Sequence, residues 1–98
     1  MSRITESARG ERCTLRITGV CNDDPATVVW AHANGVRYGK GTGKKVPDII
    51  GAYACYACHM VYDGQHKRPS GMEKVDVEID FWRGHWESLV RLSEKGLV

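Results

Sequence analysis

The alternation of apolar and polar residues predicts three short strands in the first half of the chain. Residues 13–17 alternate in the manner of a half-buried strand, and residues 18–21 then turn the chain back. Residues 27–32 are rich in β-branched and aromatic side chains, which favour a strand. Residues 49–54 are mostly apolar, and we expect them to pair with the strand that contains Val28.

The last third of the chain has the period of an amphipathic helix. Ser70 and Glu73 have the spacing of a capping box and Gly96 marks a stop, so a helix is expected over about residues 70–95. Gly84 lies within it and costs about 1 kcal/mol relative to alanine. Five apolar residues recur at steps of four and three and should face the core: Val75, Ile79, Trp82, Trp86 and Leu89.

A shorter helix is expected just after the middle of the chain, where metal-ligating residues gather. Cys55 and Cys58 are three positions apart, so two thiolates at the start of this helix could bind one metal ion. His59 and Asp63 are four positions apart and would share one side of the helix, with His66 one turn further. The segment therefore indicates one metal half-site and a second group of ligands on its flank.

Length and charge limit what such a chain can be. It has 98 residues, 42% of them hydrophobic, and a formal net charge of +2. One domain of this size has a modest core, which a structural metal would reinforce. With so small a net charge, binding of nucleic acid would depend on local clusters of cations. The amino terminus has no apolar signal segment and no stretch has the length of a membrane span, so a single intracellular domain over residues 1–98 is expected.

Four cysteines are the clearest chemical signal: Cys13, Cys21, Cys55 and Cys58. In a reducing compartment two such pairs favour a metal site over disulfides, and a Cys-x-x-Cys pair with a second pair fits tetrahedral zinc. Residues 55–59 also have the Cys-x-x-Cys-His pattern of c-type haem attachment, with His59 as the axial ligand. That alternative requires export and leaves the first two cysteines without a role.

A second group of candidate residues surrounds a glycine-rich loop. His32 ends a predicted strand just before the loop, and Asp48 after the loop could reach back towards it. The most basic patch of the chain lies between them: Arg37, Lys40, Lys44 and Lys45. Cations among glycines suit contacts to a phosphodiester backbone. A metal beside His32 would meet the needs of phosphodiester hydrolysis, and a zinc-stabilised module that binds nucleic acid without catalysis is the alternative.

Several segments, taken as an ordered set, resemble the family of small phage and prophage nucleases typified by YbcO. They are residues 8–10, Cys13, residues 19–22, Ala31 with His32, the glycine and lysine loop, residues 47–50 and residues 54–59. The resemblance covers about residues 8–64. It implies an α+β, zinc-stabilised domain of the HNH (ββα-metal, treble-clef) superfamily, to which the chain adds a C-terminal amphipathic helix.

The resemblance also implies roles for individual residues. His32 would be the general base, and His59 would bind the catalytic divalent ion. The four cysteines would hold the structural zinc. Ala31 stands where many HNH enzymes have a second metal ligand, and a middle asparagine is missing, so Asp48 and Asp63 are the candidates to complete the catalytic site.

The activity implied is that of a metal-dependent DNA endonuclease in the cytoplasm of a bacterial host. Its cofactors would be structural Zn²⁺ and a catalytic Mg²⁺, Mn²⁺ or Zn²⁺. DNA is the expected partner, no membrane is expected, and the chain would act as a monomer or a homodimer.

Overall fold

Two short antiparallel strands form the centre of the molecule. The computed structural model describes residues 2–34 and 46–98. Strand β1 (Val29–His32) pairs with β2 (Gly51–Ala54) in a register that places Trp30 opposite Tyr53 and His32 opposite Gly51. The predicted pairing of these two segments is confirmed. Both strands are shorter than expected, because only four positions of each are paired.

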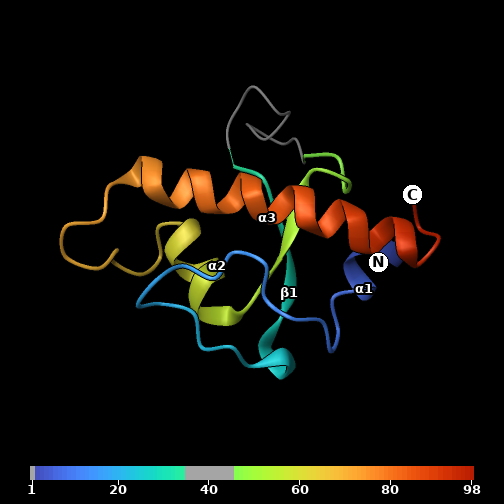
Figure 1. Ribbon diagram of the computed structural model, residues 1–98, viewed down its shortest axis with the longest axis horizontal. Coiled ribbons are helices and arrows are strands. Elements are labelled where there is room, and N and C mark those ends of the chain that lie inside the picture. Colours follow the sequence, from blue (N-terminus) through green and yellow to red (C-terminus); the bar gives the residue numbers. More distant parts are fainter. Residues whose placement is uncertain (1, 35–45) are drawn as a thin grey trace.

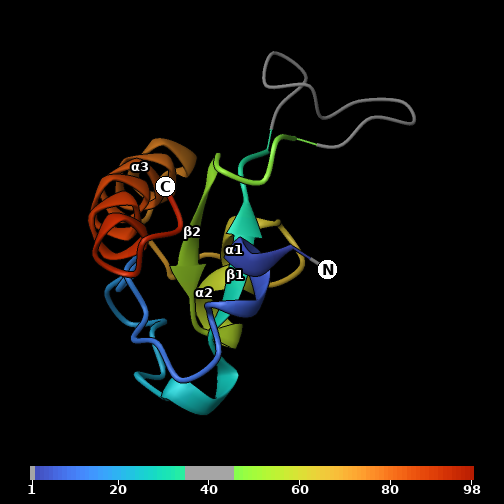
Figure 2. The same cartoon turned by 90° about the vertical axis from the view of Figure 1, so that its right-hand side faces the viewer.

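Helical segments surround this hairpin, and the longest of them runs along its side. They are α1 (Arg3–Glu6), the 3-10 turn η1 (Pro25–Thr27), α2 (Tyr56–Tyr62) and α3 (Lys74–Glu94). Helix α3 crosses the whole molecule (Figure 1) and lies next to β2, on the side away from β1 (Figure 2). No helix in the described ranges is both long and apolar enough to span a bilayer.

Side chains, and not a third strand, complete the outer edge of β2. The Tyr53 N–H donates to Ser88 Oγ at 3.0 Å, and His85 Nδ1 lies 2.7 Å from the Gly51 carbonyl oxygen. The N–H and the hydroxyl of Thr14 both donate to the Tyr53 carbonyl oxygen, at 2.8 and 2.7 Å. An open strand edge invites pairing with other chains, so this cover allows a two-stranded sheet to persist. It also fixes α3 relative to the hairpin.

A close approach at Gly84 decides which face of α3 is buried. A Cβ at this position would lie 2.8 Å from Thr14 Oγ1 and 3.1 Å from Leu15 Cδ1. Only glycine allows this spacing without displacing a neighbour. The buried residues of the helix therefore lie on the side of the glycine: Val77, Phe81, Gly84, Ser88 and Leu92.

The predicted apolar stripe of α3 is consequently wrong for three of its five positions. These three residues are 59%, 61% and 68% exposed: Val75, Ile79 and Trp86. Trp82 and Leu89 pack against the core only in part. The face that contains Gly84 and Ser88 turns inwards, because Gly84 allows the close approach to Thr14 and Ser88 accepts a hydrogen bond from the edge of β2.

The start of α3 also differs from the prediction. Glu73, and not Ser70, is the N-cap, and its backbone N–H donates to Asp76 Oδ2 at 2.8 Å. The Glu73 side chain in turn accepts from the backbone N–H of Asp76, which completes a reciprocal capping box. Gly71, at φ 86°, forms a turn before the cap, so the helix begins at Lys74.

Candidate metal centre and histidine site

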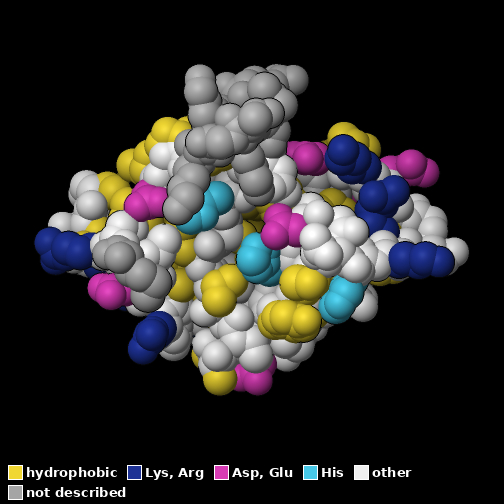
Figure 3. Space-filling model, turned by 180° about the vertical axis from the view of Figure 1, so that it is seen from behind, with side chains coloured by type: hydrophobic (Ala, Val, Ile, Leu, Met, Phe, Trp, Pro, Cys, Tyr) yellow, Lys and Arg dark blue, Asp and Glu magenta, His cyan; other side chains and the backbone are white. Residues whose placement is uncertain are grey.

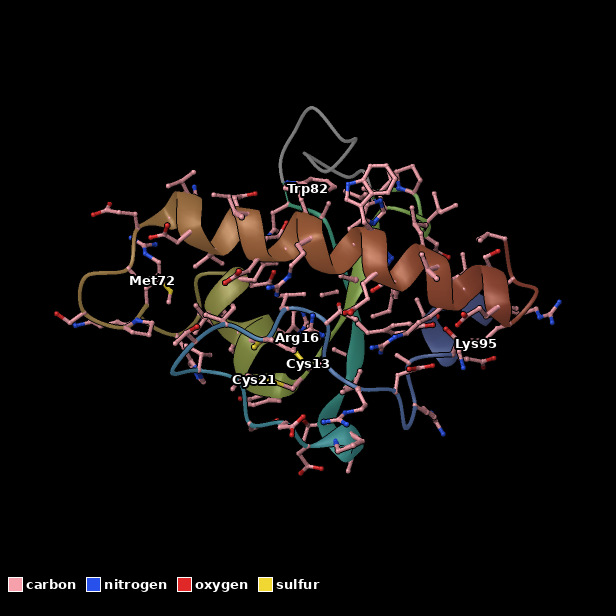
Figure 4. The ribbon with its side chains drawn as sticks, viewed as in Figure 1. Cys13, Arg16, Cys21, Met72, Trp82 and Lys95 are labelled. Atoms are coloured by element: carbon pink, nitrogen blue, oxygen red, sulfur yellow. The ribbon has the colours of Figure 1, made fainter. Side chains whose placement is uncertain are left out.

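The four cysteines meet beside the start of α2. Cys55 is the N-cap of this helix and Cys58 lies in its first turn, while Cys13 and Cys21 come from the loop before β1. Figure 4 shows the labelled Cys13 and Cys21 next to α2. The four sulfur atoms lie within 4.8 Å of one another, and those of Cys21 and Cys55 are 3.9 Å apart.

This separation fits a single tetrahedral metal ion. Sulfurs that bind zinc at about 2.3 Å are about 3.8 Å apart in a regular tetrahedron. The predicted convergence of the four cysteines is confirmed, and the donor set is the one that structural zinc prefers. Both thiols of the Cys-x-x-Cys pair belong to this cluster, which gives them a common role with the first two cysteines.

Backbone turns explain why residues 13–17 do not form the predicted strand. Within the described ranges, Arg16 (φ 45°) and Asp23 (φ 51°) are the only non-glycine residues with positive φ. The backbone N–H of Arg16 lowers the pKa of Cys13, and that of Asp23 acts in the same direction on the pKa of Cys21. A left-handed residue bends the chain back on itself, which ends any strand. The backbone thus wraps around the sulfurs.

Charge within the cluster depends on proton sharing between the thiols. A hydrogen bond from Cys58 lowers the pKa of Cys13 to about 5 and raises the pKa of Cys58. Burial, with the charge of Cys13, raises the pKa of Cys21 to about 11. A divalent ion must therefore displace thiol protons when it binds. Arg16 lies beside the thiols, and Glu87 first and then the thiolate charges raise its pKa.

His32 forms a pair with Asp48, as the sequence predicted. His32 Nε2 lies 2.9 Å from Asp48 Oδ1. Trp30, on the same face of β1, donates its indole N–H to the Asp48 carbonyl oxygen at 2.6 Å. A Cβ on Gly51 would lie 2.6 Å from that indole nitrogen, so Gly51 makes room for the ring. Sequence reasoning missed the role of Trp30, although its position two residues before His32 places both on one face.

His59 forms a second pair at the end of α2. His59 Nε2 lies 2.9 Å from Asp63 Oδ2, and Asn34 Nδ2 donates to the other oxygen of Asp63 at 3.0 Å. The backbone N–H of Asn34 also donates to the Tyr62 hydroxyl at 2.8 Å. Asn34 is two residues beyond His32, so it links the end of β1 to the end of α2. Sequence analysis gave no signal for this link, because it depends on contacts between distant segments.

Histidine and acidic side chains gather on one face of the molecule (Figure 3). An open pocket of about 410 Å³ adjoins the Asn34–Asp63 contact, and Arg68 and Lys74 also line it. These two cations come from the connection to α3 and from its first residue. They were not among the predicted site residues.

Other predicted residues lie elsewhere. Helix α2 ends before His66, whose ring instead contacts that of Tyr56 with centroids 6.0 Å apart, so the expected helical spacing to His59 is wrong. Ala31 is fully buried. The four cations of the basic loop are outside the described residues: Arg37, Lys40, Lys44 and Lys45. Within residues 2–34 and 46–98, the cysteine cluster is the only group of three or more metal-ligating side chains close enough to share an ion.

The fold and the sulfur cluster define a class: a small mixed α/β domain with a four-cysteine centre suited to zinc and a long C-terminal helix. Comparison with known proteins gives the family. Residues 2–96 match the family model described as "Putative nuclease YbcO", and the chain belongs to this family.

Relatives with this description occur in a bacterium and in a phage. The chain is 48% identical over 59 residues to "Putative nuclease YbcO" of Escherichia coli K12 and, with the same values, to "Putative nuclease ybcO" of Enterobacteria phage 82. The match spans 60% of this chain and about 60% of the length of these relatives. A solved structure, described as a "putative bacteriophage protein" from Escherichia coli K-12, has 32% sequence identity and a TM-score of 0.72, with 94% of this chain and 98% of that chain covered.

Proposed function

We propose that this chain is a metal-dependent DNA endonuclease of the HNH type. The observation that carries the proposal is the pair of His–Asp contacts, one at the end of β1 and one on α2, joined through Asn34. The "Putative nuclease" description of the family supports the general class of reaction. The structural zinc on the four cysteines would hold the loop before β1 and the start of α2 together.

His32 is proposed as the general base. In this assignment Asp48 Oδ1 accepts a hydrogen bond from the Nε2–H of His32, which leaves Nδ1 as the atom that takes the proton of the attacking water. The indole N–H of Trp30 holds the backbone carbonyl of Asp48, and Asp48 in turn orients the His32 ring. The side chains of this pair are 34% and 44% exposed, so water and a phosphate can reach them.

His59 and Asp63 are proposed to hold the catalytic divalent ion. Their ligand atoms are 2.9 Å apart, close to the roughly 3.0 Å between neighbouring positions of an octahedron with bonds of about 2.1 Å. Water and phosphate oxygens would complete the coordination, as is usual for Mg²⁺. When bound, the ion would stabilise charge on the phosphate and the leaving oxygen. Asn34 fixes the orientation of Asp63.

DNA is proposed to lie across the histidine-bearing face. Arg37, Lys40, Lys44 and Lys45 follow His32 in the sequence and lie outside the described residues. These cations are proposed to neutralise phosphates of the bound DNA. Binding should therefore weaken steeply as the salt concentration rises.

The test is plasmid nicking combined with metal analysis. His32→Ala should reduce nicking by roughly 100-fold or more while zinc content and DNA affinity stay unchanged. His66→Ala is the matched control, because His66 is an exposed histidine outside both His–Asp pairs, and it should keep full activity. Full activity of His32→Ala would refute the assignment of the base.

A zinc-stabilised module that binds nucleic acid without cleaving it is the second candidate. It is favoured by one observation: within the described residues only the cysteine cluster offers three or more ligands to one ion. This candidate predicts one zinc per chain, salt-sensitive DNA binding and no nicking with any divalent ion. Two metals per chain and nicking that requires His59 would decide for the endonuclease.

A further inference from the structure

Helix α3 carries a stripe of apolar side chains that faces water in the described part of the molecule. Val75, Ile79, Trp86 and Val90 are 59%, 61%, 68% and 59% exposed. Steps of four, seven and four residues place them on one side of a helix. This side is opposite the buried face that contains Gly84 and packs on the hairpin. We call these four residues the outer stripe.

The outer stripe is large for a chain of this size. A fully exposed Trp offers roughly 250 Å² and a branched aliphatic residue roughly 150 Å², so the four side chains leave on the order of 400 Å² of apolar surface in water. A patch of this size matches the largest apolar patch of a typical soluble protein, and such patches are often functional. The sequence pattern indicated burial of three of these residues, and the chain does not provide that burial itself.

We propose that the outer stripe binds a second copy of this chain through an antiparallel pair of α3 helices around a twofold axis. The positions of the stripe are symmetric: the midpoint between Val75 and Val90 is also the midpoint between Ile79 and Trp86. In an antiparallel pair centred there, Val75 is level with Val90 of the second copy. Ile79 is level with Trp86 of the second copy. A twofold interface requires this self-complementarity, because the same patch serves both subunits.

Charged residues near the middle of the stripe bind to their own chain. Arg83 donates to the carbonyl oxygens of Thr14 and Leu15. Glu87 accepts from Arg16 Nη1 at 2.8 Å. These contacts give both charges partners within their own chain, which lessens the repulsion between like charges of two copies.

The area predicts a dimer of moderate affinity. Two copies of the outer stripe would remove about 800 Å² of apolar surface, and flanking side chains would bring the total towards the roughly 1,200 Å² at which specific interfaces begin. We therefore expect a dissociation constant in the micromolar range. The proposal is independent of the proposed endonuclease, because the test measures mass and not activity.

Sedimentation equilibrium of the zinc-loaded full chain is the experiment. At roughly 100 µM the wild type should show twice the 10.9 kDa of one chain. Ile79→Lys and Trp86→Glu should each raise the dissociation constant at least tenfold, with unchanged helix content and zinc. Val98→Glu is the matched control: its site is 53% exposed and apolar but outside the stripe, so the dimer should persist.

A mixture of the two charged variants tests the antiparallel register. When the Ile79→Lys chain pairs with the Trp86→Glu chain, one contact brings opposite charges together and the other keeps the original Ile and Trp. The mixture should therefore recover the dimer that each variant alone has lost. A parallel pair would bring position 79 against position 79 and would not be rescued.

Two results would overturn the proposal. The first is a wild type that stays monomeric at this concentration; if its DNA affinity also falls on Ile79→Lys and Trp86→Glu, the outer stripe is a surface for nucleic acid. The second is a mixture that stays monomeric although each single variant has dissociated.

Discussion

Replacement of Gly84 by alanine tests the contact that sets α3 against the hairpin. Helix propensity alone predicts that Gly84→Ala stabilises the protein by about 1 kcal/mol. In the structure the new methyl group would lie 2.8 Å from Thr14 Oγ1 and 3.1 Å from the Thr14 carbonyl carbon. One of these atoms is backbone, so the clash cannot be relieved by a rotamer change alone. Helix propensity and the clash therefore predict changes of opposite sign in the free energy of unfolding.

The expected size follows from the atoms that must move. Overpacking of a tight interior costs about 1–3 kcal/mol. If Thr14 shifts, its hydroxyl bond to the Tyr53 carbonyl (2.7 Å) and its contact with Ser88 Oγ (3.2 Å) weaken, at about 1 kcal/mol each. After the gain in propensity is subtracted, we expect a net loss of about 2–4 kcal/mol. For a domain of this length that lowers Tm by about 10–30 °C.

Thermal unfolding of the zinc-loaded protein, followed by circular dichroism, measures this loss. Ser93→Ala on the exposed side of the same helix is the matched control and should gain up to about 0.5 kcal/mol, because it improves propensity without a clash. Zinc content is measured in parallel, since Thr14 directly follows Cys13. If Gly84→Ala is as stable as the wild type or more so, α3 does not approach the hairpin as closely as described and the reasoning fails.

Three further predictions concern the metal centre and the base. Cys55→Ser should lose zinc and cooperative unfolding at 25 °C, as measured by metal analysis and circular dichroism; a folded variant that keeps one zinc would contradict this. Zinc affinity should rise with pH, and zinc should be released as the pH falls towards the Cys13 pKa of about 5. The reason is that protons compete with the ion for the sulfurs, and the raised pKa values of Cys21 and Cys58 mean that these thiols take up protons even at higher pH. A chelator titration at several pH values measures the affinity, and an affinity that does not change with pH would exclude thiolate ligands. Trp30→Phe removes the N–H that holds Asp48 and should slow nicking about tenfold with zinc unchanged, whereas Trp86→Phe should not slow it.

Local sequence predicted the elements of this fold better than their packing. The strands around Trp30 and Tyr53 and their pairing were predictable, because β-branched and aromatic runs bounded by loops have few alternatives. The helix at the end of the chain was equally predictable from its period and its terminal glycine. Its orientation was not, because hydrophobicity at Trp86 gave no information on the close contact at Gly84.

The candidate site was predicted in the same uneven way. Four cysteines and a reducing context were enough to predict a shared metal centre, and the loop geometry placed Asp48 within reach of His32. The supporting residues were not predictable. Trp30 bonds to the Asp48 carbonyl and Asn34 to the Asp63 side chain, both distant in sequence. The two-residue spacing places Trp30 on the face of His32 but gives no sign of its contact with Asp48.

The amino-acid sequence by itself determined the donor chemistry of this protein: which thiols, imidazoles and carboxylates are present, and which of them share an element. Residue type and local period are enough for that, since they depend on neighbours along the chain. Only the tertiary structure decided which face of α3 is buried, which turn wraps each sulfur and which side chains hold the two His–Asp pairs. Those outcomes depend on differences of a few tenths of an ångström in the contact distances between segments far apart in sequence. At such contacts, packing and hydrogen bonds outweigh the hydrophobic pattern.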